Sequence, residues 1–370
     1  MGLTSLEYPQ LPSGMRVEII TGSFGAGHDA AAHEIARRLH GVGLETRVSD
    51  IVDLMPGWTG RLLRSLYLRQ IQSVPRTWSW LLGGLSRHDS VATLVARLVG
   101  STTRALLDLA ADGPAWFVST HPFASQALGR LRSDGRLAVP TATYLTDMSV
   151  HRLWVHAGID VHLAMHELPG DEARALGARR VAVVSPAVPR PAQPAVPARR
   201  ADFQLPADRP LVLVTGGSLG IGELAATARD IAATGRAVAV VLCGRNERLR
   251  RSLHGEPGIV ALSWVDDIPD LLRCVDAVVQ NAGGFTSLQT LAAGVPMASY
   301  RCIAGHGESN AAALDRAGLV RWLHCAEDLD HWLTTALERG ADVAVPTSRL
   351  PSLDAPTIAD VLVPAAEAVA

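Results

Sequence analysis

Short apolar segments recur along the chain, and each is separated from the next by roughly the length of a helix. In the first half they cover residues 16–20, 45–48, 115–119, 140–145 and 181–184, and in the second half 211–214, 237–243, 259–262, 277–279 and 296–300. These segments have the length and composition of β-strands, and residues 30–39 carry apolar side chains at helical spacing. Strands that alternate with helices predict an α/β fold with parallel sheets.

The pattern divides into two similar halves. Each half opens with a strand and a glycine-rich turn, GSFGAGH at 22–28 and TGGSLGIG at 215–222, and a proline-rich segment at 185–210 separates them. A chain of 370 residues exceeds what one core usually organises. We therefore predict two Rossmann-like domains that face each other across a cleft, over residues 1–190 and 211–345. Residues 191–210 are the predicted linker, and 346–370 are a tail with a closing helix.

The second glycine turn also resembles the turn of short-chain dehydrogenases. Their catalytic tyrosine needs a nearby lysine to lower its pKa, and this chain contains no lysine. No acidic residue follows the strand at 239–244 to hold an adenosine ribose. A phosphate-binding turn for another ligand is therefore the better interpretation, because glycines let backbone N–H groups approach phosphate oxygens.

Composition narrows the function further. The net charge of -2 argues against binding to nucleic acid through bulk electrostatics. The four cysteines form no CxxC pair, so neither a disulfide framework nor a zinc knuckle is indicated. The start of the chain does not resemble a signal peptide, and no run of about 18 uncharged apolar residues suggests a membrane span. We expect a cytoplasmic protein, and nothing indicates its oligomeric state.

Four stretches, taken together, resemble a known family. They are GSFGAGH at 22–28, TDMSVHRLWVH at 146–156, LVTGGSLG at 213–220 with VLCGRN and SWVDDIPD downstream, and NAGGFTSLQTLAAGVP at 281–296 leading into IAGHGESN at 303–310. In this order they are similar to GT-B glycosyltransferases related to monogalactosyldiacylglycerol synthases and processive diacylglycerol glucosyltransferases. More distantly they resemble the N-acetylglucosaminyltransferase that makes the last lipid-linked peptidoglycan precursor.

This resemblance implies an inverting hexosyltransferase that uses a UDP-sugar as co-substrate and a membrane lipid such as diacylglycerol as acceptor. The donor would bind the C-terminal half and the acceptor the N-terminal half, with neither a metal nor another cofactor. Two alternatives stay open: a soluble natural product as acceptor, and a degenerate relative that binds a nucleotide sugar without transfer. The second gains support from Gln289, which stands where the family usually has glutamate, and from the altered stretch at 305–308.

The candidate donor-binding residues lie in the second half. Backbone N–H groups of the second glycine turn and of the helix start near residue 284 would hold the diphosphate, and an arginine would add a cation. The alternatives that involve no ligand are a tight turn for the glycines, a solvated arginine, core packing at 264–265, and a helix cap at Thr286. The full set comprises Gly217, Ser218, Leu219, Gly220, Arg245, Trp264, Val265, Gly283, Gly284, Phe285, Thr286, Gln289, Glu308 and Asn310.

Two residues are candidates for the base that deprotonates the acceptor. His28 ends the first glycine turn, where a helix start keeps an imidazole neutral, and Asp147 follows a predicted strand. His28 could instead only bind acceptor or phosphate, and Asp147 could orient His151 or cap a helix. The candidate acceptor-binding residues are Gly25, Gly27, His151 and Trp154. The spacing of His151, Trp154 and His156 fits a packing and hydrogen-bonding corner better than a metal site.

A further prediction concerns residues 58–108, which hold seven arginines against two aspartates. Leu62 and Leu63 belong to a set of apolar positions at helical spacing, with Arg61 and Arg64 nearby. We predict contact with an anionic membrane surface, which would make the protein peripheral on the inner face of the cell membrane. The alternative is a pair of helices that cover the core and expose arginines to solvent.

Overall fold

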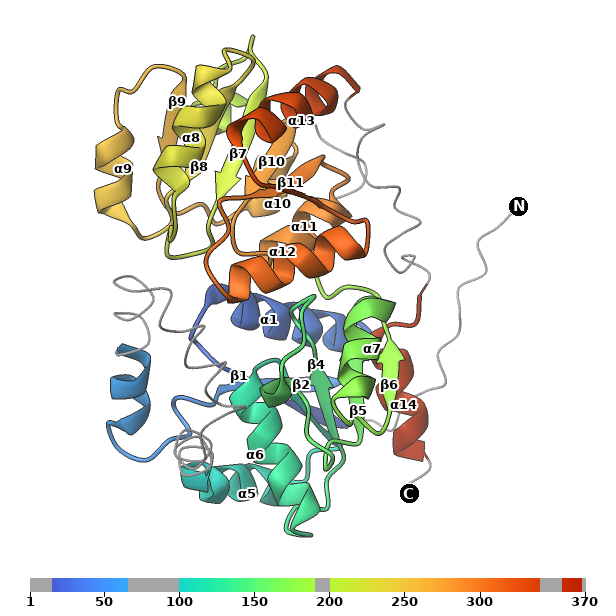
Figure 1. Cartoon of the computed structure of the whole chain (residues 1–370). Coiled ribbons are helices and arrows are strands. Elements are labelled where there is room, and N and C mark those ends of the chain that lie inside the picture. The colour runs from blue at the N-terminus through green and yellow to red at the C-terminus, as the bar shows by residue number, and fades with distance from the viewer. Residues whose placement is uncertain (1–14, 66–99, 190–199, 340–354, 368–370) are drawn as a thin grey trace.

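The structure is a computed structural model that describes residues 15–65, 100–189, 200–339 and 355–367. It contains two α/β domains, each built on a six-stranded parallel sheet. Figure 1 shows the C-terminal domain above the N-terminal domain, with α1 (Ala26–Gly41) and α12 (His306–Arg316) at the junction. The predicted α/β class is confirmed.

The N-terminal sheet has the strand order β2-β1-β3-β4-β5-β6. Its strands are β1 Arg16–Thr21, β2 Glu45–Asp50, β3 Trp116–Ser119, β4 Thr141–Tyr144, β5 Val161–Ala164 and β6 Val181–Val183. Besides α1, the helices of this domain are α5 Thr103–Ala111, α6 Pro122–Ser133, the short 3-10 helix η1 Arg152–Trp154, and α7 Glu167–Ala175.

The C-terminal sheet has the order β12-β11-β10-β7-β8-β9. Its strands are β7 Leu211–Thr215, β8 Val238–Leu242, β9 Ile259–Leu262, β10 Ala277–Gln280, β11 Met297–Tyr300 and β12 Arg321–Leu323. Besides α12, the helices are α8 Leu224–Ala233, α9 Glu247–Leu253, α10 Ile268–Leu272, α11 Phe285–Ala292 and α13 Ala326–Arg339, with a 3-10 helix η2 at Arg200–Phe203.

Both faces of the N-terminal sheet are buried, which explains why its central strands read as continuous apolar runs. In β1, Val17 and Ile19 belong to the core that includes α1, whereas Ile20 joins Phe117 in the core beneath α6. All three β1 side chains have 0–1% exposed surface.

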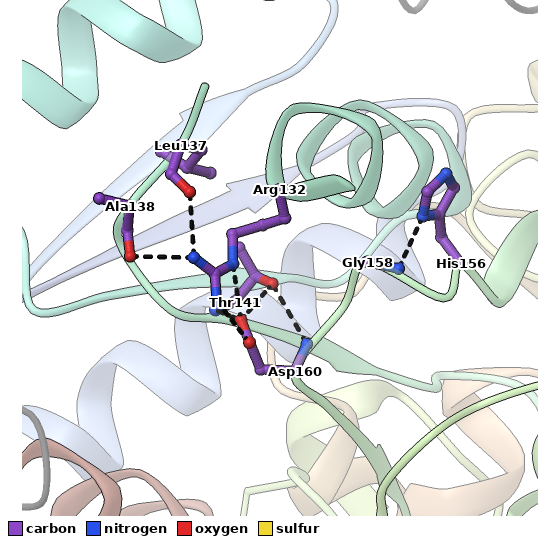
Figure 2. A network of polar contacts seen from close by, with 7 residues as sticks. All are labelled: Arg132, Leu137, Ala138, Thr141, His156, Gly158 and Asp160. Carbon is purple, nitrogen blue, oxygen red and sulfur yellow. Dashed lines mark hydrogen bonds and ion pairs between the residues drawn. The ribbon is translucent and has the colours of Figure 1, made fainter. Parts of the chain in front are cut away.

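A polar network fixes the connection from α6 to β4 and β5 (Figure 2). The guanidinium of Arg132 donates to both carboxylate oxygens of Asp160, at 3.0 and 2.6 Å, and to the carbonyl oxygens of Leu137 and Ala138. Asp160 also accepts from the backbone N–H and the hydroxyl of Thr141. These bonds set where β4 begins, and β4 leads directly to Asp147.

The chain crosses between the domains twice. Residues 190–199 of the predicted linker lie outside the described residues, but η2 packs on the C-terminal domain, where Arg200 donates to the Cys274 carbonyl and to Asp276. Helix α14 (Ile358–Glu367) lies within the predicted C-terminal tail and packs against α1 in the N-terminal domain. Its Ile358 and Leu362 are buried in the same core as Val17.

Candidate active site

The carboxyl ends of the two sheets meet at the domain junction. Asp147 follows β4 in the N-terminal domain, and α12 follows β11 in the C-terminal domain. The backbone N–H groups of Met148 and Ser149 both donate to Oδ1 of Asn310 in α12, at 3.1 Å. The turn after Asp147 therefore lies next to Asn310, one of the predicted donor residues.

The first glycine turn brings α1 close to its neighbours. Gly22 passes so near His121 that a Cβ at this position would lie 2.6 Å from the imidazole. Gly25 is the N-cap of α1, and Gly27 packs against Phe285 of the other domain, whose Cβ is 3.1 Å from the position of an added Cβ. Gly27 thus contributes to the domain contact, in addition to the acceptor contact we predicted for it.

His28 has a defined tautomer. Its Nδ1 lies 2.8 Å from the carbonyl oxygen of Thr120 and 3.2 Å from Oγ1 of Thr146. A carbonyl oxygen can only accept, so Nδ1 carries the proton and Nε2 has a free lone pair. Burial lowers the pKa of His28 below its ordinary value, and the neighbouring Asp147 carboxylate partly opposes that shift. The imidazole is consequently neutral near pH 7 and able to accept a proton at Nε2.

Aromatic side chains enclose His28. The ring of His121 meets it edge-on at 4.7 Å, and the indole of Trp154 lies 5.8 Å away. Trp154 is fully buried and packs beside His28. Burial lowers the pKa of His151 to about 4 and that of His121 well below its usual value.

Asp147 is almost fully buried and has a partner from the opposite domain. Its Oδ1 lies 3.6 Å from Nε2 of His306, the first residue of α12. His306 itself is 38% exposed. The carboxylate, the two imidazoles of His28 and His306, and the glycine turns therefore surround the junction of the two domains.

The second glycine turn is a turn of its own and not the first turn of a helix. Gly217, Gly220 and Gly222 have φ values of 75, 55 and 91°, and α8 begins only at Leu224. Residues 217–220 thus precede α8 and do not form its first turn. Their N–H groups depend on the turn itself, where Gly220 donates to the Gly217 carbonyl at 3.1 Å.

Asn281, which we did not single out from the sequence, holds three loops together. Its Nδ2 donates to the Ile221 carbonyl at 2.8 Å, and its own carbonyl accepts from the Ile303 N–H at 2.9 Å. A Cβ on Gly222 would lie 2.3 Å from that Nδ2, and one on Gly307 would lie 2.5 Å from the Asn281 carbonyl oxygen. The glycines are required here because the asparagine fills the space that their side chains would occupy.

Arg245 and Trp264 form an exposed pair beside this turn. The guanidinium lies 5.0 Å from the centre of the indole, and the indole N–H donates to Asp266. Trp264 is 42% exposed, whereas Val265 packs partly against the core. The Arg245 N–H donates to the Ser218 carbonyl, so the predicted donor residues Ser218, Arg245 and Trp264 lie together.

The start of α11 differs in detail from the prediction. Gly284 is the N-cap of α11, and Thr286 is the second residue of the helix. The alternative that Thr286 caps this helix is therefore wrong. Gly283 has a φ of 74°, and Phe285 is buried against Gly27. Gln289 lies on α11, and Glu308 accepts from the Gly305 N–H at the start of α12.

Among the described residues, no group of three or more His, Cys, Asp or Glu side chains is arranged to hold a metal ion. In the same part of the chain, no helix combines the length and the apolar character needed to cross a membrane. Trp58 and Leu62 are nevertheless exposed, at 66 and 42%.

Comparison with known proteins supports the family resemblance. The family model of monogalactosyldiacylglycerol (MGDG) synthase matches residues 28–184. A processive diacylglycerol β-glucosyltransferase of Bacillus mycoides is 22% identical over 318 residues, which are 82% of this chain and 80% of that relative. The comparisons thus find similarity to the same group of proteins that the four stretches of the sequence resemble.

Solved structures confirm the GT-B fold. MurG of Acinetobacter baumannii superposes with a TM-score of 0.56 at 17% identity, covering 96% of this chain and 99% of that one. A Medicago truncatula glycosyltransferase, UGT71G1, crystallised with UDP-glucose, superposes with a TM-score of 0.57 at 13% identity, covering 96 and 93%.

Proposed function

We propose that this chain is an inverting glycosyltransferase of membrane lipids. Its residues 28–184 match the family model of monogalactosyldiacylglycerol synthase, and the chain has the GT-B fold. It transfers a hexose from a UDP-sugar to a lipid hydroxyl, with diacylglycerol as the acceptor. The names of its curated relatives support the acceptor, and the UDP-glucose bound to a protein of the same fold supports the donor.

The proposed mechanism depends on His28 being neutral, with the lone pair of Nε2 free. The acceptor hydroxyl gives its proton to Nε2 of His28 while its oxygen forms a bond to the anomeric carbon. The bond between that carbon and the diphosphate oxygen breaks, and the electron pair leaves with UDP. Backbone N–H groups of Gly217, Ser218 and Leu219 and of the start of α11 stabilise the charge on the departing diphosphate. The negative charge of Asp147 stabilises the imidazolium cation that forms when His28 takes the proton.

A transfer assay tests this function. The purified full-length protein is incubated with radiolabelled UDP-glucose or UDP-galactose and vesicles containing diacylglycerol, and labelled glycolipid is separated by chromatography. We expect His28→Ala to lower kcat about a hundredfold or more, because general-base catalysis contributes that much. His33→Ala is the matched control, since His33 lies exposed on the same helix. A β-configured product from an α-configured donor would show inversion.

The assay also separates the alternatives. Binding of UDP-sugars without turnover by the unmodified protein would favour a non-catalytic relative. Transfer to soluble aromatic acceptors, with none to diacylglycerol, would favour a natural-product enzyme and contradict the lipid acceptor.

Membrane attachment is part of the proposal. Trp58 and Leu62 lie one helical turn apart beside Arg61 and Arg64, and residues 59–65 are helical. Exposed apolar side chains next to arginines fit the surface of an anionic bilayer. The rest of the predicted surface, residues 66–99, lies outside the described residues.

Flotation with vesicles of anionic lipid tests this attachment. The double change Trp58→Ser and Leu62→Ser should reduce the floating fraction, and high salt should reduce it in the unmodified protein. Arg236→Gln, an exposed arginine in the other domain, should leave flotation unchanged. Equal flotation of all three proteins would contradict attachment through this helix.

A further inference from the structure

An ion-pair cluster joins the two segments that border the second glycine turn. Arg301 follows β11 and opens the loop at 301–305, which leads into α12. Its guanidinium donates to Glu223 at 2.7 Å and to Asp230 at 3.0 Å. Glu223 is the N-cap residue of α8 and comes directly after Gly222, the last glycine of the turn. The cluster therefore connects the end of the glycine turn to the beginning of the loop.

The cluster is a network and not a single surface pair. Oδ2 of Asp230 also accepts from the Tyr300 hydroxyl at 2.9 Å, and the Arg301 guanidinium lies 5.3 Å from the centre of the Tyr300 ring. The side chains of Arg301 and Asp230 are partly buried, with 33 and 24% of their surface exposed. Ion pairs contribute more to structure when several charged groups share them than when they are isolated on the surface. Arg301 therefore has a defined position, which a solvated arginine would not have.

The backbone of Arg301 adopts a conformation that favours glycine. Its φ is 47°, and among the described residues Gln204 is the only other non-glycine residue with a positive φ. A side chain in this left-handed region crowds the following carbonyl oxygen, so the conformation persists only where the surroundings hold it. Glycine would relieve the strain, but it would also remove the guanidinium. The strained arginine is explained by the contacts that its side chain makes.

The loop that Arg301 opens lies directly against the glycine turn. A Cβ on Gly222 would lie 3.2 Å from Cγ1 of Ile303, and the Ile303 N–H donates to the Asn281 carbonyl at 2.9 Å. Asn281 in turn donates through Nδ2 to the Ile221 carbonyl. The turn and the loop thus contact each other through Ile303 and Asn281, and the ion pairs of Arg301 add a further link between them.

We propose that Arg301 is a positioning residue that holds the turn at 215–222 against the loop at 301–305 and so orders the diphosphate-binding N–H groups before the donor arrives. Its polar contacts are with β11 and α8, so it acts on the donor through the turn. A turn that is already ordered loses less conformational entropy when a ligand binds, which increases affinity. The inference rests on the proposed function, because it concerns the donor of that reaction.

Arg301→Gly tests the proposal, because glycine accepts this backbone conformation and only the side chain is lost. We expect the Kd of UDP, measured by isothermal titration calorimetry on the full-length protein, to rise about tenfold. The KM for the UDP-sugar should rise in parallel, whereas kcat at saturating donor should change by no more than about twofold, because the bound donor then orders the turn.

Two further variants test the same contact in other ways. Glu223→Gln weakens the bond from its other side without changing the backbone at 301, and it should also raise the Kd of UDP. Arg301→Lys keeps a cation near the same carboxylates but cannot bridge them with a planar fork, so it should recover only part of the affinity that Arg301→Gly loses.

Arg236→Gln is the matched control. It removes an arginine–carboxylate pair of similar exposure from the same domain, between Arg236 and Asp330 at 2.7 Å, and neither residue belongs to the turn or the loop. The Kd of UDP should change by no more than about twofold in this variant. An equal rise in Arg236→Gln and Arg301→Gly would show only a general effect of lost charge and would overturn the proposal.

Hydrogen exchange tests the link without any nucleotide. The Thr227 N–H donates to the Glu223 carbonyl at 2.9 Å, so it reports how firmly the start of α8 is held. Peptides that cover residues 219–228 should exchange faster in Arg301→Gly than in the unmodified protein, while those of α9 should not change. Residues 219–228 are remote in sequence from the substitution, so the added glycine cannot itself account for faster exchange there.

Three results would overturn the proposal: unchanged exchange over residues 219–228, unchanged UDP affinity in Arg301→Gly, or a fall in its kcat with an unchanged KM. Failure of the unmodified protein to bind UDP would instead count against the proposed function. The exchange measurement would still decide, in that case, whether Arg301 holds the turn.

Discussion

The proposed role of His28 as a base depends on one hydrogen bond. The Thr120 carbonyl takes the proton-bearing Nδ1, so the opposite nitrogen remains free to accept a proton. The backbone that holds this carbonyl is itself fixed by the Thr120 hydroxyl, which donates to the carbonyl of His28 at 3.1 Å. The geometry of the base thus depends on neighbouring backbone and not on a second charged side chain.

The acidic limb of kcat/KM should report this histidine. Burial lowers the pKa of His28, so the base stays neutral below the pH at which a free histidine becomes protonated. We expect activity to be retained down to pH 6.5 and to fall only below it, with a midpoint under the ordinary value of about 6.5. Initial rates at low donor concentration between pH 4.5 and 8 measure the limb. A midpoint above 6.5 would show that the histidine is not the group that titrates.

Single-residue chemistry was only partly predictable from the sequence. His28 and Asp147 stand next to recognisable motifs, so their proximity followed from two strands ending at one edge. Asn281 and His306 were missed as site residues because their partners, Ile221 and Asp147, are distant in sequence. Pairing of that kind depends on how the domains pack, and no local spacing encodes it.

The glycine turn after β7 shows how an element limits its own sequence. Gly220 has a φ of 55°, and a Cβ on it would lie 2.3 Å from the Cys243 carbonyl oxygen. Both the left-handed backbone and the close approach of β8 exclude a side chain. The turn at residues 217–220 therefore tolerates only glycine at this position.

Gly220→Ala should weaken donor binding. It should also lower the free energy of unfolding by more than the backbone strain of a left-handed alanine, because the added Cβ meets the Cys243 carbonyl oxygen. Gly235→Ala is its matched control, because Gly235 has a similar φ of 67° but no atom within 4 Å of an added Cβ. The control should cost only about 1 kcal/mol, which is the penalty of a left-handed alanine. Melting temperatures and UDP affinities of the two variants measure the difference. Equal losses in both would mean that the contact with Cys243 does not matter.

Apolar runs predicted ten strands close to their observed bounds, and two short strands were missed. In β5, a fully buried His162 interrupts the apolar pattern. In β12, the edge strand, Arg321 is exposed, so only one residue of three is buried. Parallel strands inside a sheet are recognisable because both faces are covered, whereas edges and strands with a buried polar residue lack that signal.

At the scale of the molecule, buried histidines link stability to pH. His162 is fully buried in β5, and burial lowers its pKa to about 4. Below pH 6.5 the unfolded chain binds a proton there, while the folded protein does not until about pH 4. The free energy of unfolding is therefore unaffected above pH 6.5 and falls as the pH drops through this window, by about 3 kcal/mol in full.

Replacing His162 should make the stability of the folded protein less dependent on pH. Between pH 7.5 and 5.0 the melting temperature of His162→Leu should fall less than that of the unmodified protein, and calorimetry measures both. His33→Gln, which changes an exposed histidine, should behave like the unmodified protein. Parallel decreases in all three proteins would assign the acid sensitivity to other groups.

The last described helix, α14, packs in the domain that begins the chain, and this limits how the protein can be divided. Cleavage within residues 190–199 would not produce two complete domains. The second fragment would carry Ile358 and Leu362, which belong to the core of the first. Fragments expressed separately should therefore reassemble through a helix supplied in trans. A reporter fused after α14 would sit on the N-terminal domain, although it follows the C-terminal domain in the gene.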